Sequence, residues 1–166
     1  METLKITKAD LNERNEYARS RDLEFEGHIE IEASLGRVTV LGFIRAAGNL
    51  AIEAGGWIKA GGWIEAGGWI KAGDGIKAGG GIEAGDGIKA GGGIEAGGGI
   101  EAGGSLNAGL AIKAKAGITV KLRIFAGLCT WRLPKPEEQV IECAELIEGT
   151  VCFGELKLLP AKTKAA

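Results

Sequence analysis

The side chains best suited to chemistry are few in this chain. His28 is the only histidine, and a zinc site takes at least three protein ligands. Carboxylates are numerous, but they recur at regular positions of a repeat and not as a convergent acid–base pair. No GxSxG motif is present, and the GxG strings lack the Lys-Ser/Thr of a phosphate-binding loop. We therefore expect no enzymatic activity, no metal and no cofactor.

The cysteines are Cys129, Cys143 and Cys152, an odd number without a CxxC pair. In a chain whose first residues are charged and show no signal peptide, this pattern predicts free thiols in a reducing compartment. We expect them to be buried as small hydrophobic residues.

The tryptophans Trp57, Trp63 and Trp69 are more informative, because each directly precedes an isoleucine of a six-residue series. If those isoleucines point into a core, the tryptophans point outward. Outward tryptophan is costly to leave bare and is common in interfaces. Two possibilities remain for what covers these tryptophans: another part of the same chain, or a partner or second copy.

The element that positions these residues is a six-residue repeat. From Ile52 the chain reads IEAGGW, IKAGGW, IEAGGW, IKAGDG and onward to IKAKAG. Within each hexad the order Ile–charge–Ala has period two, so Ile and Ala share one face of a short strand and the charge takes the other. Two glycines per hexad exclude a helix, since each costs about 1 kcal/mol relative to alanine.

Short strands of this kind could form a meander of hairpins or a coil that always turns the same way. In a meander around Gly61-Gly62, Lys59 would face Ile64, so charged and apolar residues would share a face. A parallel coil instead stacks each isoleucine on the next. The sequence therefore predicts an all-β, single-stranded parallel β-solenoid, triangular, with about 18 residues per coil; its handedness is left open.

An 18-residue coil also sorts the charges by side. Glu65, Glu83 and Glu101 form one acidic ladder, and Lys71 and Lys89 form a second ladder that ends in Asn107. The third side carries Lys59, Lys77 and Glu95. The ladders are either solvated faces or a binding strip for a basic partner.

The hexads resemble the hexapeptide-repeat β-helices, both the acyltransferase type and the bactofilin type of filament protein, over roughly residues 23 to 124. Here the alanine follows the isoleucine by two, whereas the left-handed hexapeptide pattern has the small residue two places before it. The acyltransferase resemblance implies a histidine base, but His28 in EGHI is expected on the surface. The GxGIxA hexads, with DLEFEGHIEIE and LRIFAGLCTWRLP beside them, are also similar to uncharacterised proteins of bacteria and their phages.

Four regions are predicted. Residues 1–22 are expected to form a helical cap, with a capping box of Thr7 and Asp10 and a helix over Lys8–Ser20. Residues 23–124 form the solenoid, with a bulged corner near Ala47–Asn49. Residues 125–160 follow as an antiparallel β cap with strands around Glu148-Gly149, since an open end exposes unpaired backbone. Residues 161–166 are predicted to be a disordered tail.

The composition bears on which classes of partner this protein could bind. Twenty basic and 22 acidic residues give a formal charge of −2, which does not favour nucleic acid or an anionic membrane as partner. No apolar stretch is long enough to span a bilayer, and a cytoplasmic protein is expected. We expect a non-enzymatic binding protein with a protein partner, such as a phage-associated modulator of a host protein. The alternatives are a self-associating scaffold of the bactofilin type and, with least support, an ice-binding protein.

Overall fold

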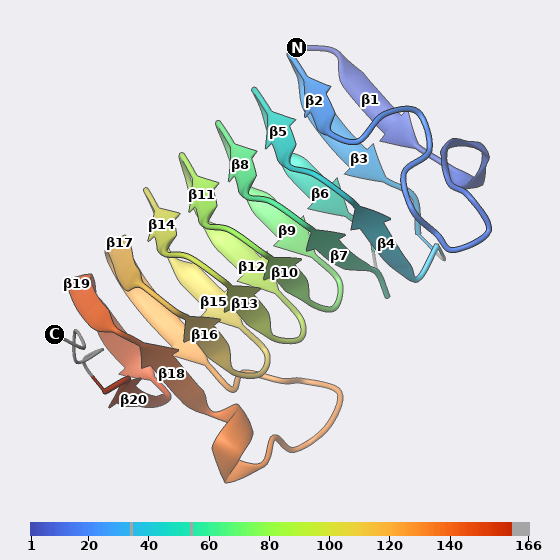
Figure 1. Ribbon diagram of the computed structural model, residues 1–166. Helices are drawn as coiled ribbons and strands as arrows, with labels where there is room; N and C mark the ends of the chain where they lie inside the picture. Colours follow the sequence, from blue (N-terminus) through green and yellow to red (C-terminus); the bar gives the residue numbers. More distant parts are fainter. Residues whose placement is uncertain (34, 54, 161–166) are drawn as a thin grey trace, which may run out of the picture.

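The computed structural model describes residues 1–33, 35–53 and 55–160. These residues form a single solenoid, in which short parallel strands of successive coils stack along a common axis (Figure 1). The first strand, β1 (Thr3–Ile6), and the last strand, β20 (Glu155–Leu158), lie at opposite ends of the solenoid (Figure 1). The predicted all-β parallel solenoid is confirmed, and every pairing between two strands is parallel within the described residues. In the same part of the chain, no helix is long and apolar enough to cross a membrane.

The strands stack into three faces, called A, B and C here. Face A consists of β2 (Leu23–Phe25), β5 (Ile44–Ala46), β8 (Ile64–Ala66), β11 (Ile82–Ala84) and β14 (Ile100–Ala102). Face B consists of β1 (Thr3–Ile6), β3 (His28–Ile31), β6 (Leu50–Ile52), β9 (Ile70–Ala72), β12 (Ile88–Ala90) and β15 (Leu106–Ala108). Face C consists of β4 (Arg37–Val40), β7 (Trp57–Ala60), β10 (Ile76–Ala78), β13 (Ile94–Ala96), β16 (Ile112–Ala114), β18 (Val140–Cys143) and β20 (Glu155–Leu158). The longer strands β17 (Gly117–Ala126) and β19 (Glu145–Phe153) each run along face A and then face B.

Each coil repeats the register of the coil before it. Ile76 pairs with Ile58 on one side and with Ile94 on the other, so a full turn takes 18 residues. From Ile58 to Ala114, the aliphatic residue and the alanine of each hexad are buried, and the polar or charged residue between them points outward. The core is therefore a column of stacked isoleucines on each face, as the period-two pattern predicts.

The first glycine of each corner is required by close stacking of the coils. A Cβ on Gly79 would lie 2.1 Å from the carbonyl oxygen of Gly61, and one on Gly97 would lie 2.0 Å from that of Gly79. The backbone N–H of Gly79 donates to the Ala60 carbonyl of the preceding coil at 3.0 Å. A glycine allows the chain to approach this closely, and glycine holds this position in every hexad from Gly61 to Gly109, whereas Lys115 takes it in the last hexad.

The predicted helix over Lys8–Ser20 is wrong. The segment holds a single 3-10 turn, η1 (Lys8–Asp10), capped by Thr7 and Asp10 as expected, and β1 precedes it. The segment has few apolar residues to stabilise a helix, and its backbone is instead bonded to face C. The Tyr17 N–H donates to the Thr39 carbonyl at 2.8 Å, and the Thr39 N–H donates to the Asn15 carbonyl at 3.0 Å.

The predicted antiparallel cap is also wrong, because the solenoid continues to Leu158. Ile141 of β18 stacks on Ile112, and Leu156 of β20 stacks on Ile141, both in parallel register. Gly149 does not turn a hairpin; with φ of 127° it lies inside β19 between the stretch on face A and the stretch on face B. Between β17 and β18, a loop over residues 127–139 contains the 3-10 turn η2 (Pro136–Glu138).

The register change near the start of the repeat lies later than predicted. Leu50 pairs with Ile70 and Ile52 pairs with Ala72, so Ile52 fills the second inward position of its hexad, not the first. The extra residues therefore fall between β6 and β7, and not at Ala47–Asn49. Ala54, assigned to the first hexad from sequence, and the predicted tail 161–166 lie outside the described residues.

Candidate functional site

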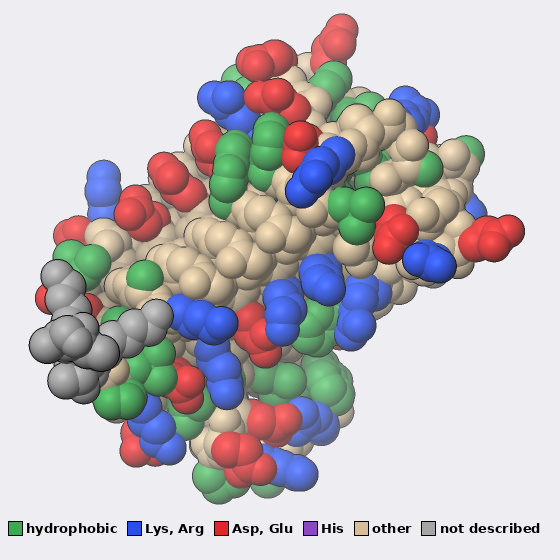
Figure 2. All heavy atoms as spheres, in the orientation of Figure 1, with side chains coloured by type: hydrophobic (Ala, Val, Ile, Leu, Met, Phe, Trp, Pro, Cys, Tyr) green, Lys and Arg blue, Asp and Glu red, His purple; other side chains and the backbone are tan. Residues whose placement is uncertain are grey.

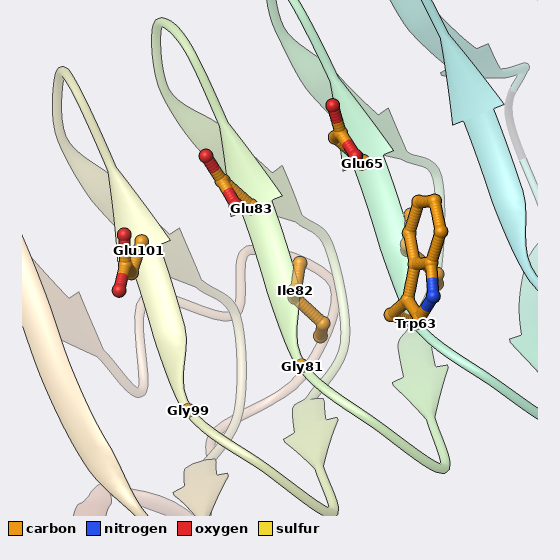
Figure 3. Close-up of a pocket in the computed structure, with 8 residues that line it drawn as sticks. Trp63, Glu65, Gly81, Ile82, Glu83, Gly99 and Glu101 are labelled. Carbon is orange, nitrogen blue, oxygen red and sulfur yellow. The ribbon is translucent and has the colours of Figure 1, made fainter.

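An acidic row runs along face A beside Trp63. Glu65 pairs in register with Glu83, and Glu83 pairs with Glu101, so the three carboxylates stack in successive coils. A groove of about 210 Å³ lies beside them, lined by Trp63, the three glutamates and the small residues Gly81 and Gly99. Figure 3 shows the carboxylates following one another along the face, with the Trp63 ring at one end of the row. We call Glu65, Glu83 and Glu101 the acidic row.

The charge of this row is only partly compensated. Arg45 of β5 lies 3.6 Å from Glu65 and 3.2 Å from Glu24. It therefore pairs with the first carboxylate of the row, at the N-terminal end. Among the residues that the structure describes, no ion pair reaches Glu83 or Glu101. Figure 2 shows acidic side chains following one edge of the coil and basic side chains following another. The outer part of face A therefore presents unneutralised carboxylates to solvent.

The three tryptophans point outward and occupy one corner-adjacent position on each face, and a neighbouring coil covers part of each ring. The Trp63 ring stacks on Phe43 of the preceding coil, with ring centroids 4.4 Å apart and an interplanar angle of 5°. Arg37 lies 5.5 Å from the Trp57 ring centroid. Trp63 and Trp69 still expose 38% and 44% of their surface. Part of each ring is thus covered by neighbouring coils of the same chain.

Sequence reasoning missed why the tryptophans fit their surroundings. A Cβ on Gly75 would lie 2.6 Å from the Trp57 ring, and one on Gly87 would lie 2.4 Å from the Trp69 ring. These glycines stand one coil after the tryptophans, so each ring lies flat on backbone that has no side chain. The recurrence of glycine 18 residues after tryptophan was the available signal.

Face B carries the lysine ladder. Lys71 pairs with Lys89, and Lys89 pairs with Asn107. Lys89 and Asn107 line a larger groove, of about 650 Å³, whose other wall includes Leu128 and Trp131 of the loop over residues 127–139. This loop contact was not predicted, because sequence spacing does not show where a loop folds back.

The loop is held by an ion pair with two hydrogen bonds. Arg132 donates to both carboxylate oxygens of Glu138 at 2.7 and 2.6 Å, and the Lys135 N–H donates to the same carboxylate at 2.9 Å. The Arg132 guanidinium, followed by the Lys135 N–H, lowers the pKa of Glu138 to about 2. The carboxylate is therefore ionised at neutral pH and joins Arg132 and Lys135 within the loop.

His28 takes part in a corner hydrogen-bond series on face B. Its Nδ1 accepts the Asn49 N–H at 2.9 Å, and the Asn49 Oδ1 accepts the Trp69 N–H at 2.8 Å. The imidazole thus satisfies backbone at the corner, and no cysteine or carboxylate joins it in a metal-binding cluster within the described ranges.

The three thiols are free, but only Cys143 is buried, and burial raises its pKa. Cys129 is partly exposed and Cys152 is exposed, so the expectation that all three are buried is wrong. Cys152 lies in β19, within the last coil that the structure describes.

Comparison with known proteins gives no match to this chain among family models, curated proteins or solved structures. The fold and the surface described above therefore stand on the chain's own sequence and structure.

Proposed function

We propose that this chain is a non-enzymatic binding protein whose acidic row receives a basic segment of a protein partner. The observation that carries the proposal is the pair Glu83 and Glu101, which have no ion-pair partner among the described residues and stand beside the exposed Trp63. Lysine or arginine side chains can pair with such carboxylates and also lie against a tryptophan ring. The rigid coil would hold these groups in fixed register.

Other features support the same proposal. An acidic row disfavours nucleic acid, whose phosphates would be repelled. The resemblance to phage proteins favours a host protein as the partner, in keeping with a modulator role in the cytoplasm. Trp57, Trp69 and the ladder of Lys71 and Lys89 lie on the other faces and would serve as secondary contacts.

The experiment is affinity capture from bacterial lysate with a charge-reversed variant, Glu65→Lys, Glu83→Lys and Glu101→Lys. The matched control is Lys71→Glu with Lys89→Glu on face B. A protein captured by the wild type and by the control, but not by the face A variant, supports the proposal. Equal capture by all three proteins would contradict it.

A second candidate is a self-associating scaffold, the role of the bactofilin type. The observation that favours it is the exposed apolar side chains of the last coil, among them Leu156 and Leu158. Electron microscopy of the purified chain tests it, because a scaffold of this kind grows into filaments. Ice binding has the least support, since glutamate and lysine occupy the outward positions where such proteins carry threonine; a thermal-hysteresis assay tests it.

A further inference from the structure

The last coil of the solenoid is open at its C-terminal side. In the part of the chain that the structure describes, β19 pairs only with β17 and β20 pairs only with β18. All four residues of β20 are exposed, including Leu156 at 38% and Leu158 at 62%. Yet these leucines are core residues by register, because Leu156 stacks on Ile141 and Leu158 stacks on Cys143.

The backbone of β20 is also half unpaired. The Glu155 N–H donates to the Gln139 carbonyl and the Leu159 N–H donates to the Cys143 carbonyl, both at 2.8 Å and both toward the preceding coil. Because successive residues of a strand direct their N–H groups to opposite sides, those of Leu156 and Leu158 point away from the coil. An edge of this kind is a template for pairing with another strand.

The charges of β20 favour antiparallel pairing with the same strand of a second copy. Its sequence is Glu155-Leu156-Lys157-Leu158, so the two charges point to one side and the two leucines to the other. In an antiparallel pairing with Leu156 opposite Leu156, Glu155 of each copy faces Lys157 of the other. Shifting the register by two residues either way places Glu155 opposite Glu155 or Lys157 opposite Lys157, which is unfavourable.

The hydrogen bonds agree with the same register. With Leu156 opposite Leu156, the unpaired backbone groups of the two Leu156 residues meet each other. The apolar side chains of the two last coils then close one continuous core. We propose that two copies of this chain join tail to tail through β20, in an antiparallel pair about a two-fold axis perpendicular to the coil.

At the N-terminal end β1 and β2 are also edge strands, but this end does not offer the same exposed apolar contact. Ile6 and Leu23 of the first coil are buried, and Leu11 and Tyr17 of the segment between them pack against the core. Assembly through β20 alone stops at two copies, so the expected particle is a dimer of about twice 17.1 kDa and not a filament. This inference concerns the end of the coil and does not depend on the partner proposed for face A.

The test uses sedimentation velocity of the full chain over a range of concentrations. Wild type is expected to show a monomer–dimer equilibrium. Glu155→Lys and Lys157→Glu each place like charges in both cross-strand pairs, and each is expected to weaken the dimer roughly tenfold or more at low salt. An equimolar mixture of the two variants restores opposite charges and is expected to dimerise again, as is the double variant carrying both changes.

A second pair of variants addresses the apolar contact. Leu158→Glu is expected to abolish the dimer without unfolding the monomer, as judged by circular dichroism. Leu133→Glu is the matched control, because Leu133 is 91% exposed on the loop over residues 127–139 and should leave the dimer unchanged. Three results would overturn the proposal: a monomer of the wild type at every concentration, filaments of the wild type, or single charge variants that dimerise as strongly as the wild type.

Discussion

The first and last coils of this solenoid are built on the same register but end differently. At the N-terminal side, residues 15–17 bond to Thr39 on face C, Leu11 and Tyr17 pack against the core, and Ile6 is completely buried. At the C-terminal side, Leu158 occupies an equivalent inward position and is 62% exposed. The difference does not come from the strands, since both coils pair in parallel with the same stacking of apolar residues.

The repeat therefore determines how the coils stack, but it does not determine how the first and last coils are covered. Every internal coil is covered by its two neighbours, so its isoleucines are buried whatever the flanks contain. Each terminal coil needs a cover that the repeat does not supply. Here the chain itself supplies one cover, and we infer that a second copy supplies the other.

The largest difference in the free energy of unfolding is expected when one inward-facing residue is truncated at each end of the solenoid. Ile6→Ala should lower the free energy of unfolding by about 2–5 kcal/mol, because it leaves a cavity in the core of the first coil. Leu158→Ala should cost less than about 1 kcal/mol in the monomer, because most of that side chain already contacts water. Urea denaturation at a protein concentration well below that of dimer formation measures both. Equal losses in the free energy of unfolding would contradict the claim that the N-terminal end is covered and the C-terminal end is not.

A smaller effect is expected at Asp10, which is buried in the segment that closes the N-terminal end. The Thr7 N–H, which donates to the carboxylate at 2.8 Å, and the neighbouring Arg19 lower the pKa of Asp10. Asp10→Asn should cost about 1–3 kcal/mol at pH 7. Since the folded pKa is depressed, this contribution is full above about pH 4 and is lost as the pH falls through the folded value.

Denaturation of wild type and of Asp10→Asn at pH 7 and pH 3 tests this prediction, with Asp22→Asn as a second carboxylate control. The difference between wild type and Asp10→Asn should shrink at the lower pH. A difference that stays constant with pH would show that the charge of Asp10 does not stabilise the N-terminal segment.

A local effect is expected in the loop near the C-terminal end. Because the pKa of Glu138 is lowered to about 2, its contact with Arg132 should persist at neutral pH and weaken only as the pH falls below about 4.5 toward 2. Glu138→Gln should loosen the loop at pH 7 while leaving the global unfolding transition nearly unchanged. Acrylamide quenching of the Trp131 fluorescence, isolated by subtracting a Trp131→Phe variant, measures the loop. Unchanged quenching in Glu138→Gln would contradict this role.

The smallest effect on stability concerns the thiols. Cys152 is exposed on the last coil, whereas Cys143 is buried one coil earlier and its pKa is raised by burial. A thiol reagent should label Cys152 quickly in the folded protein and Cys143 only on unfolding, and labelling of Cys152 should leave the unfolding transition unchanged. Mass spectrometry of peptides after timed labelling distinguishes them. Rapid labelling of Cys143 would show that the last coil opens.

The repeat was readable from sequence because its pattern is strictly local. Ile–charge–Ala with period two, followed by glycine, determines which side chains point inward, and the stack of Glu65, Glu83 and Glu101 follows from the length of the coil. The tryptophans were correctly placed outside for the same reason, as each precedes an inward isoleucine.

The ends were not readable, because they depend on contacts between distant segments. Lys8–Ser20 has ordinary helix formers, yet its backbone bonds to Thr39 instead. Glu148-Gly149 suggests a hairpin turn, but Gly149 lies within one strand that passes from face A to face B. The groove between Lys89 and Trp131 depends on where the loop folds back, which spacing along the chain does not reveal.

Hydrogen–deuterium exchange at two protein concentrations tests most directly whether the two ends are closed in different ways. The account predicts that the amides of Leu156 and Leu158 in β20 become more protected as concentration rises, while those of β1 and of residues 7–19 do not change. Protection of β20 that is the same at both concentrations, or protection of β1 that rises with concentration, would contradict the account.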